Sequence, residues 1–365
     1  MSQKWSYKKI YDKLKNEIIN SVYPFESYLP SESMLAEQYS VSRPTIAKVY
    51  NTLQDEGFVV KRPGMGTTVI YKTQKEKKTF GLLLPGAGES EIFSIINERF
   101  LDQSKRGLFD CLWEGTTTSN AELRRSLIEK YVSEYISQHV DGIFFAPLER
   151  IKDADKLNQE ICRKIEDAGI PLVLIDRDIL EFPLRSRFDL VCLDNFHAGY
   201  YMTEHLIKAG CEKIYFFVRP DSANSVKMRF YGVSAAMQNS NLSIDSTNAI
   251  AGNPDDLDLI KSIKIVPRKT GIICANDSTA AVLMSSLDSI GIKIGSDILV
   301  AGYDDMKYAD HLKYPLTSFR QPCTYITDVA IDLMFRRIQN PNSKPLLVNL
   351  EGTLIQRDSS RFSEN

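Results

Sequence analysis

The chain of 365 residues has a globular composition, with 43% apolar and 25% charged residues, and its length predicts two or three domains. No run of about 18 apolar residues occurs, so we expect no membrane-spanning helix. The N-terminal MSQKWSYKKIYDKL lacks the apolar core of a signal peptide, and the six cysteines are scattered without a CxxC pair. These features predict a cytoplasmic protein without disulfides.

Charge is divided unevenly along the chain, whose net charge is −2. Residues 1–80 hold 13 Lys and Arg against 8 Asp and Glu, a net charge of +5, while the remainder holds 32 against 39, a net charge of −7. A basic N-terminal segment on an acidic body predicts an anionic partner for that segment alone. A merely solvated basic surface is the simpler alternative.

The first 72 residues predict three helices followed by a β-hairpin. An amphipathic helix spans 7–20, a second begins after the N-cap Ser31, and a third spans 43–56, where Gly57 ends it. The β-prone stretches FVVKR and TTVIY are joined by PGMG, whose composition suits a hairpin turn. This order is typical of a winged helix-turn-helix, in which the third helix enters the major groove of double-stranded DNA.

This N-terminal segment, called the head below, resembles the DNA-binding domain of the GntR family. The resemblance lies in the stretch LPSESMLAEQYSVSRPTIAKVYNTLQDEGFVVKRPGMGTTV. The ordered motifs LPSE, VSR followed by Thr45, EGF and the glycine-rich wing carry the resemblance, and the domain is expected to span 1–71. The candidate DNA-binding residues are Ser31, Ser42, Arg43, Thr45, Lys48, Lys61, Arg62, Gly64 and Gly66.

Arg43 is the best candidate for a bidentate contact to guanine or phosphate, and the wing glycines allow backbone to approach a sugar-phosphate edge. The resemblance also shows two departures, because the family usually has an arginine at the position of Ser33 and often has one at Ala47. Base reading is therefore expected to rest on Arg43 and Lys48. A solvated surface side chain is the alternative for each candidate taken singly.

The body begins after a polar linker, KTQKEKKT, at 72–79. From there, short apolar strands such as FGLLLP, DGIFFAP and KIYFFV alternate with longer helical patterns. Buried strands that alternate with crossover helices predict an α/β fold with parallel sheets. The large number of strands favours two similar lobes with a ligand cleft at the carboxyl ends of the strands.

Four polar side chains lie where such a cleft would bind its ligand. Asp176 follows PLVLI, Asn276 follows GIICA, Asp304 follows ILVAGY, and Arg229 opens the helix after KIYFFV. Carboxylates accept hydrogen bonds from vicinal hydroxyls, and guanidinium groups donate to hydroxyl or ring oxygens. The set predicts a small neutral polyhydroxylated ligand.

The body resembles the effector domain of LacI-family regulators, a relative of periplasmic sugar-binding proteins. The resemblance covers 80–356 and rests on DNFHAGYYMTEHLIKAGCEKI, RFYG, GIICANDSTAAVLMSSLDSIGIKIGSDILVAGYDD and PLTSFRQP. It implies sugar-binding roles at the four polar positions above and a less fixed role for Asn253. Phe93, after the first strand, is either a ring that stacks on the sugar or a core phenylalanine, and an aromatic residue often found near the position of Cys323 is missing.

The resemblance also implies a domain of two lobes, 80–189 with 321–347 and 190–320 with 348–361, within 80–365. Other polar residues are interpreted as structural. Asp277 is expected to cap a helix that begins at Ser278, and Asp194 to cap the helix that follows it. The isolated histidines show no catalytic or metal-ligand spacing, so neither a metal nor a cofactor is expected.

Three functions are compatible with a basic head on a two-lobed body. The leading hypothesis is a homodimeric transcriptional repressor, similar to arabinose-repressor-type regulators, that binds an operator and responds to L-arabinose or another pentose or deoxyhexose. A sugar-modifying enzyme with a DNA-binding head is the alternative, but no phosphate-binding GxxxxGK[ST] motif or nucleophile elbow occurs in the sequence. A transport binding protein would not need a basic head.

Overall fold

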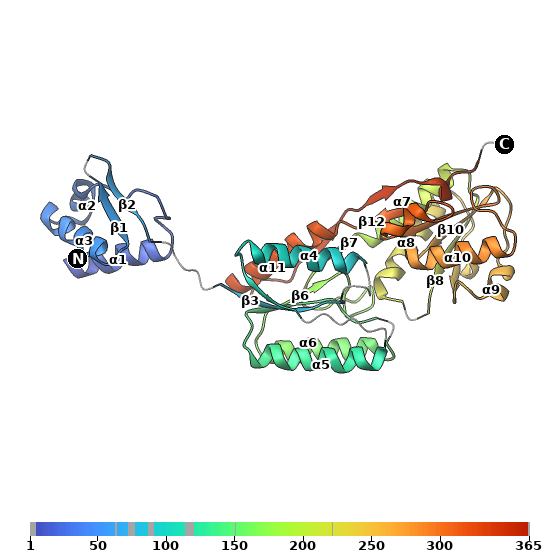
Figure 1. Ribbon diagram of the computed structural model, residues 1–365, viewed down its shortest axis with the longest axis horizontal. Helices are drawn as coiled ribbons and strands as arrows, with labels where there is room; N and C mark the ends of the chain where they lie inside the picture. The colour runs from blue at the N-terminus through green and yellow to red at the C-terminus, as the bar shows by residue number, and fades with distance from the viewer. Residues whose placement is uncertain are drawn as a thin grey trace. The chain divides into compact units, whose positions relative to one another are not determined.

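The chain divides into two compact units, a head of Met1–Lys77 and a body of Lys78–Asn365 (Figure 1). The computed structural model describes residues 5–62, 64–71, 77–86, 91–113, 120–149, 151–220 and 222–363. Most of the predicted linker, at 72–76, lies outside these residues, and Thr79 already belongs to the first strand of the body. In the described ranges, no helix has the length and apolar character needed to cross a bilayer.

The head has the predicted order of three helices and an antiparallel hairpin. Its elements are α1 (Tyr7–Ile19), α2 (Glu32–Tyr39), α3 (Arg43–Asp55), β1 (Val59–Arg62) and β2 (Gly66–Val69). One buried apolar cluster joins all of them, and it includes Leu14 of α1, Leu35 of α2, Leu53 of α3 and Val69 of β2. The periodic apolar positions of the sequence therefore form the core that fixes α3 against α1 and α2.

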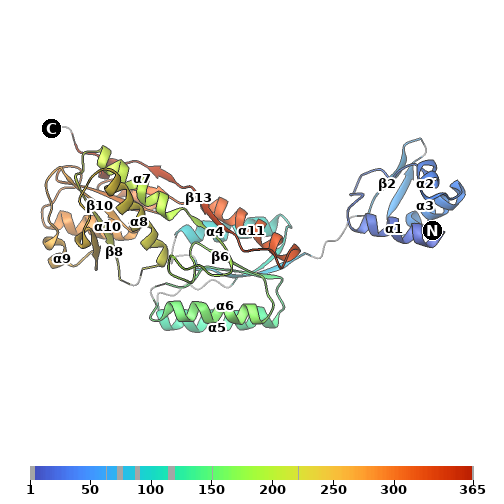
Figure 2. The ribbon, with the colours of Figure 1, turned by 180° about the vertical axis from the view of Figure 1, so that it is seen from behind.

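The first lobe of the body is built on a six-stranded parallel sheet with the order β13-β7-β6-β5-β3-β4. Its strands are β3 (Thr79–Leu83), β4 (Asp110–Leu112), β5 (Gly142–Phe145), β6 (Leu172–Ile175), β7 (Asp189–Leu193) and β13 (Leu347–Leu350). Its helices are α4 (Glu91–Lys105), α5 (Ala121–Ser137), α6 (Ala154–Asp167) and α11 (Cys323–Gln339). Helices α4 and α11 cover one face, and α5 and α6 cover the other (Figure 2).

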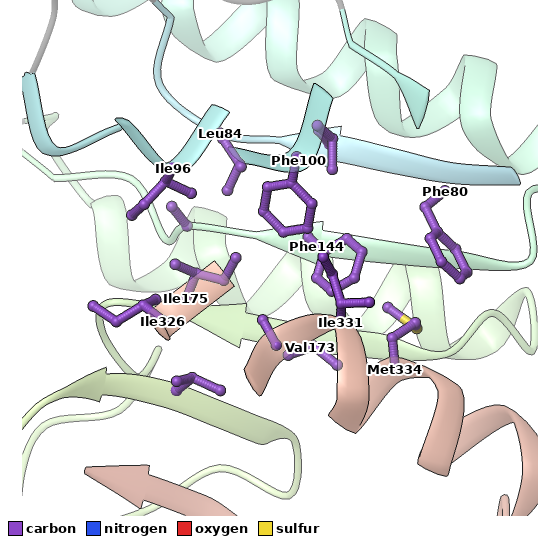
Figure 3. Close-up of a cluster of buried hydrophobic side chains, with 14 of the residues drawn as sticks. Phe80, Leu84, Ile96, Phe100, Phe144, Val173, Ile175, Ile326, Ile331 and Met334 are labelled. Atoms are coloured by element: carbon purple, nitrogen blue, oxygen red, sulfur yellow. The ribbon is translucent and has the colours of Figure 1, made fainter. Parts of the chain in front are cut away.

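The core under α4 and α11 is rich in aromatic side chains (Figure 3). Phe80 and Phe144 meet edge to face with ring centroids 5.6 Å apart, and Phe100 lies 4.6 Å from Phe144. Ile331 and Met334 of α11 complete this cluster from a segment far away in the sequence. The C-terminal helix is therefore part of the first lobe and not of the second.

The second lobe has the sheet order β14-β12-β11-β10-β8-β9, in which only β14 pairs antiparallel to its neighbour. Its strands are β8 (Lys213–Val218), β9 (Ala249–Ala251), β10 (Thr270–Cys274), β11 (Ile298–Tyr303), β12 (Thr317–Arg320) and β14 (Thr353–Ile355). Its helices are α7 (Asn195–Lys208), α8 (Asn224–Asn239), α9 (Leu257–Ser262) and α10 (Asp277–Ser289), with short 3₁₀ turns at Ser246–Asn248, Lys307–His311 and Asp358–Ser360.

The chain passes between the two sheets three times, after β7, after β12 and after β13. The predicted boundary after 320 agrees with the end of β12, but the boundaries at 189/190 and 347/348 are wrong. They cut β7 and β13, which pair with each other in the first sheet through Leu347 opposite Leu190. Sequence patterns could not locate these crossings reliably, because each strand ends only two or three residues before the next element starts.

Helices α7 and α8 pack in unusually close contact through two glycines. A Cβ atom on Gly199 would lie 2.0 Å from the carbonyl oxygen of Arg229, and one on Gly232 would lie 2.0 Å from that of Phe196. Neither position has room for a side chain, because the neighbouring atoms belong to backbone. The two glycines therefore set the distance between the helices.

We expect Gly199→Ala to lower the free energy of unfolding by about 1–3 kcal/mol or more, because the added methyl group must push α8 away from α7. Urea unfolding followed by circular dichroism measures this loss. Ser234→Ala, at a half-buried position of α8, is the control and should change stability by less than about 0.5 kcal/mol. Equal stability of the two variants would contradict the close-packing argument.

Candidate functional site

The start of α3 presents Arg43, an exposed candidate for DNA contact. The Arg43 side chain is 70% exposed, and its Nε lies 3.5 Å from Oε2 of Glu32. Ser42 occupies the predicted N-cap position, but its hydroxyl pairs with Thr45 Oγ1 at 2.8 Å and not with a helix N–H. The first N–H groups of α3, at the positive end of the helix dipole, are therefore not capped by that hydroxyl.

Two of the predicted cations are held by other groups of the head. Lys61 Nζ donates to Asn51 Oδ1 at 2.7 Å and lies 3.1 Å from Oε1 of Glu32. Lys48 Nζ lies 5.2 Å from the centre of the Tyr7 ring, in cation–π geometry. The sequence interpretation missed Glu32, whose carboxylate faces both Arg43 and Lys61.

The remaining head candidates lie in the hairpin and at the start of α2. Arg62 is exposed at the end of β1, and Gly64 and Gly66 have φ angles of 74° and 94°, which only glycine adopts readily. Ser31 is the N-cap of α2, as predicted, and its hydroxyl accepts from Met34 N at 3.2 Å. Contact of these residues with DNA remains a prediction.

Arg229 is the central side chain of the second lobe's candidate site. It lies in α8, five residues after the helix begins and not at its start as the sequence suggested, and it is 4% exposed. Its Nε donates to Asn195 Oδ1 at 2.8 Å, and its Nη1 donates to the carbonyl of Ala275 at 2.5 Å. The guanidinium also stacks over the Tyr303 ring, 4.5 Å from its centre.

Asp304 follows β11 with a φ angle of 101°, a left-handed backbone conformation that is strained for aspartate. Gln321, on the crossing after β12, donates to its Oδ1 at 2.7 Å. Burial raises the pKa of Asp304 above its usual range, and the nearby charge of Arg229 opposes that rise. Gln321 was not among the site residues predicted from the sequence, although it directly follows β12, a strand that ends at the cleft.

Asp176 supplies the first lobe's part of the site. It is 4% exposed, has a φ angle of 73°, and accepts from Arg177 Nε at 2.7 Å. Arg177 also lies 2.8 Å from Oε2 of Glu149, and the charges of Asp176 and Glu149 both act on Asp304. The structure therefore brings together carboxylates from both lobes, and Arg177 and Glu149 join them although the sequence interpretation missed both.

The helix cap expected at Asp277 lies one residue earlier, at Asn276. Asn276 is the N-cap of α10, because its Oδ1 accepts from Thr279 N at 2.9 Å. Asp277 is the first residue of the helix, is fully buried, and accepts from Ser318 Oγ at 2.7 Å and Met306 N at 2.9 Å. Burial raises the pKa of Asp277 well above its usual range. The prediction that Asp277 caps a helix starting at Ser278 is therefore wrong, whereas the cap at Asp194 is confirmed.

Two further candidates lie apart from this group. Phe93 is in the first turn of α4, only 1% exposed, and belongs to the core cluster of the first lobe. Its ring offers no open face to a sugar, so the core alternative describes it. Asn253 is exposed in the loop after β9, and the hydrogen bonds of Arg229 go to Asn195 and Ala275 and not to Asn253. Its role in binding stays a prediction.

A cavity of about 840 Å³ opens between the two lobes next to this group. Glu149 and Arg177 of the first lobe and Arg219, Lys227 and Tyr231 of the second are among its lining residues. None of the six predicted effector-binding residues lines it. Among the described residues, no cluster of His, Cys, Asp or Glu has the geometry to hold a metal. Burial raises the pKa of Cys323 to about 12, which keeps this thiol protonated at neutral pH.

Comparisons with known proteins agree with both halves of this description. Residues 6–69 match the gntR family of bacterial regulatory proteins, and residues 203–360 match the periplasmic binding protein-like domain. The arabinose metabolism transcriptional repressor of Geobacillus stearothermophilus is 24% identical over 351 residues, which cover 90% of this chain and 91% of that protein.

Two solved structures share the fold of the body. A LacI family transcriptional regulator from Enterococcus faecium with bound ribose aligns with a TM-score of 0.61 and 22% identity over 79% of this chain and all of that one. The complex of the transcriptional regulator CelR with cellobiose aligns with a TM-score of 0.63 and 21% identity over 91% of this chain and all of that one.

The curated relative that covers nine-tenths of this chain is a transcriptional repressor. This chain joins a DNA-binding head of the GntR type to a periplasmic-binding-protein-like body of the kind found in LacI-family regulators.

We expect Arg229→Lys to lower the free energy of unfolding by about 1–3 kcal/mol, because a single ammonium cannot satisfy both the Asn195 amide oxygen and the Ala275 carbonyl in the buried site. Urea unfolding is again the measurement. Arg219→Lys is the control, since Arg219 is half-buried and its Nε donates to Thr279 Oγ1 at 3.2 Å. A smaller loss at Arg229 than at Arg219 would refute this account.

Proposed function

We propose that this chain represses carbohydrate-utilisation genes and that a small neutral sugar in the cleft of the body controls its affinity for an operator. The observation that carries the proposal is that Arg229 of α8 and Asp176 after β6 both act on Asp304 after β11, so that the two lobes share one polar group in a chain with a DNA-binding head. The ribose and cellobiose named for the two structural neighbours support a sugar as the effector.

L-arabinose or another pentose or deoxyhexose is the first candidate for this inner site. The support is the likeness to an arabinose metabolism repressor over nine-tenths of the chain. Carboxylates at Asp176 and Asp304 can accept from vicinal hydroxyls, while Asn276, whose Oδ1 caps α10, has an amide nitrogen available to donate. The site thus contains both acceptors and donors for a hydroxyl-rich ring.

The regulator would act in the cytoplasm as a homodimer, because one winged helix-turn-helix gives too little affinity and specificity for a genomic site. Ile95 of α4 and Leu123 of α5 are 43% and 47% exposed, which supports a dimer face on those helices. A sugar that binds one arrangement of the lobes better than another would shift the population of head arrangements. The shift in the equilibrium between the two lobe arrangements is set by the sugar's differential affinity for them.

Two measurements test the proposal directly. Fluorescence anisotropy with a duplex selected from a random pool should show binding that weakens steeply as salt rises, because bound phosphates release counterions. A thermal-shift screen over pentoses, deoxyhexoses and hexoses should identify sugars that raise the melting temperature by mass action. Absence of DNA binding even at low salt would refute the regulator function of the head.

We expect Arg43→Ala to weaken binding to the selected duplex and to reduce the slope of log K against log salt by about one, since one phosphate or base contact is lost. Sugar binding should not change. Arg106→Ala, which removes a body arginine with a 61% exposed side chain, is the matched control and should leave DNA affinity unchanged. Equal effects of the two variants would show that α3 does not read DNA.

We expect sugar affinity to fall as the pH is lowered from neutral to mildly acidic values. The raised pKa of Asp304 means that its carboxylate is protonated at a higher pH than an ordinary aspartate, which removes an acceptor for sugar hydroxyls. Asp304→Asn should bind the sugar about 10- to 100-fold more weakly at neutral pH and should lose this pH dependence. Calorimetric titration of both proteins across the pH range is the measurement, and an identical pH profile would contradict the role of Asp304.

A further inference from the structure

The hairpin of β1 and β2, which forms the wing of the head, extends beyond the apolar core. Val59 at the start of β1 is fully buried, Lys61 is half-buried, and Arg62 at the end of the strand is exposed. On the side away from β1, β2 is joined to residues 27–29 by backbone hydrogen bonds of 2.9 Å. Because the apolar core ends at Val59, the position of the outer part of β1 against α3 depends on polar contacts.

The ammonium group of Lys61 supplies these contacts. Its Nζ donates to Asn51 Oδ1 at 2.7 Å and to the carbonyl of Ala47 at 3.4 Å, both in α3. It also donates to Oε1 of Glu32, in α2, at 3.1 Å, and it lies 5.8 Å from the centre of the Tyr50 ring. A lysine ammonium has three N–H donors and no acceptor, so these three oxygens match its hydrogen-bonding capacity.

The main chain of Lys61 is bound to the same helix. Its N–H donates to Gln54 Oε1 at 3.0 Å. Asn51 and Gln54 are three residues apart and therefore lie on one face of α3, the face that β1 approaches. Lys61 also pairs with Thr67 in the register of the hairpin, so its contacts act on both strands. One residue thus joins the wing to the helix that is predicted to enter the major groove.

A DNA phosphate could bind this ammonium only by displacing its partners. The Lys61 side chain is 28% exposed, and loss of the pair would leave the Glu32 carboxylate, which is 24% exposed, with one donor fewer. A partly buried polar group that loses its hydrogen-bond partner raises the free energy of the complex. Arg43 differs, because its side chain is 70% exposed and its Nε lies 3.5 Å from Oε2 of Glu32. Of these two cations, Arg43 is the one placed to contact DNA.

We infer that Lys61 is a positioning residue that fixes the wing on α3 before DNA binds, and not the phosphate contact that its charge suggested from the sequence. The inference rests on the proposed DNA-binding function of the head. A wing that is already fixed loses little conformational freedom when it reaches DNA, which increases affinity. Loss of Lys61 should therefore weaken binding by a factor that does not depend on salt, because no counterion is released at this residue.

Fluorescence anisotropy of the full-length chain with the selected duplex, repeated over a series of salt concentrations, tests this role. We expect Lys61→Met to weaken binding about five- to tenfold at each salt concentration and to change the slope of log K against log salt by less than about 0.3. Lys261→Met, the same substitution at an exposed position of α9, is the control and should change neither quantity. A slope reduced by about one, as for a lost phosphate contact, would overturn the inference, and so would an unchanged affinity.

A second variant removes the acceptor of the same contact without a change in charge. Asn51→Leu deletes the oxygen that lies 2.7 Å from Lys61 Nζ. Because both substitutions break one contact, the double variant Lys61→Met/Asn51→Leu should bind within about twofold of the weaker single variant. Losses that multiply in the double variant would show that Lys61 acts on DNA independently of Asn51, which refutes the positioning role.

Hydrogen exchange measures the wing in the absence of DNA. The amides of β1 and β2 should exchange about threefold faster or more in Lys61→Met and in Asn51→Leu, whereas those of α1 should not change. Asn51→Asp, which keeps an oxygen acceptor, should retain the rates of the unmodified chain. Equal wing rates in Lys61→Met and the unmodified chain would contradict the inference. If the unmodified chain binds no duplex even at low salt, the proposed function fails, while the exchange rates still decide whether Lys61 holds the wing.

Discussion

The burial of one positive charge, the Arg229 guanidinium, organises the second lobe. A buried charge is tolerated only when its donors are satisfied and a counter-charge lies near. Here the acceptors come from α7 and the end of β10, and the stacking ring and the carboxylate come from β11 and the residue after it. These elements can meet only because Gly199 and Gly232 let α8 approach α7 closely. The close packing of α7 against α8 and the placement of the Arg229 guanidinium therefore depend on the same two glycines.

The first lobe contributes a group of charged side chains near Arg229, made of Arg177, Asp176 and Glu149. Arg177 holds Asp176 and Glu149 in place, and Glu149 reaches the N-terminus of α8 through the N–H of Ala223. A ligand that bridges Asp176 and Arg229 must alter the balance of these contacts between the lobes. This is the physical route by which occupancy of the cleft becomes a difference in free energy between lobe arrangements.

The sequence predicted a candidate site from residues that follow strand ends. Asp176 and Asp304 follow buried parallel strands, whose carboxyl ends must share one edge of a sheet, and periodic apolar residues fixed the helices of the head. Features that depend on tertiary contacts were not visible in the pattern. From the sequence alone, Phe93 could be a ligand contact or a core residue, and only the packing of α4 on its sheet decides between them. The lobe boundaries depend on the pairing of β7 with β13. The partners Glu149 and Gln321 are distant in sequence from the residues they support.

In the head, one carboxylate lies beside two of the predicted DNA-binding cations. Glu32 holds Arg43 and Lys61, so DNA phosphate must compete with a carboxylate for the same cations. The sequence resemblance implies that the family usually has an arginine at the position of Ser33 and often at that of Ala47, so the positive charge expected of one head is further reduced. In the proposed dimer, affinity then depends on both heads reaching their half-sites together. In that proposed dimer, a change between lobe arrangements would act on DNA affinity by altering whether both heads reach their half-sites together.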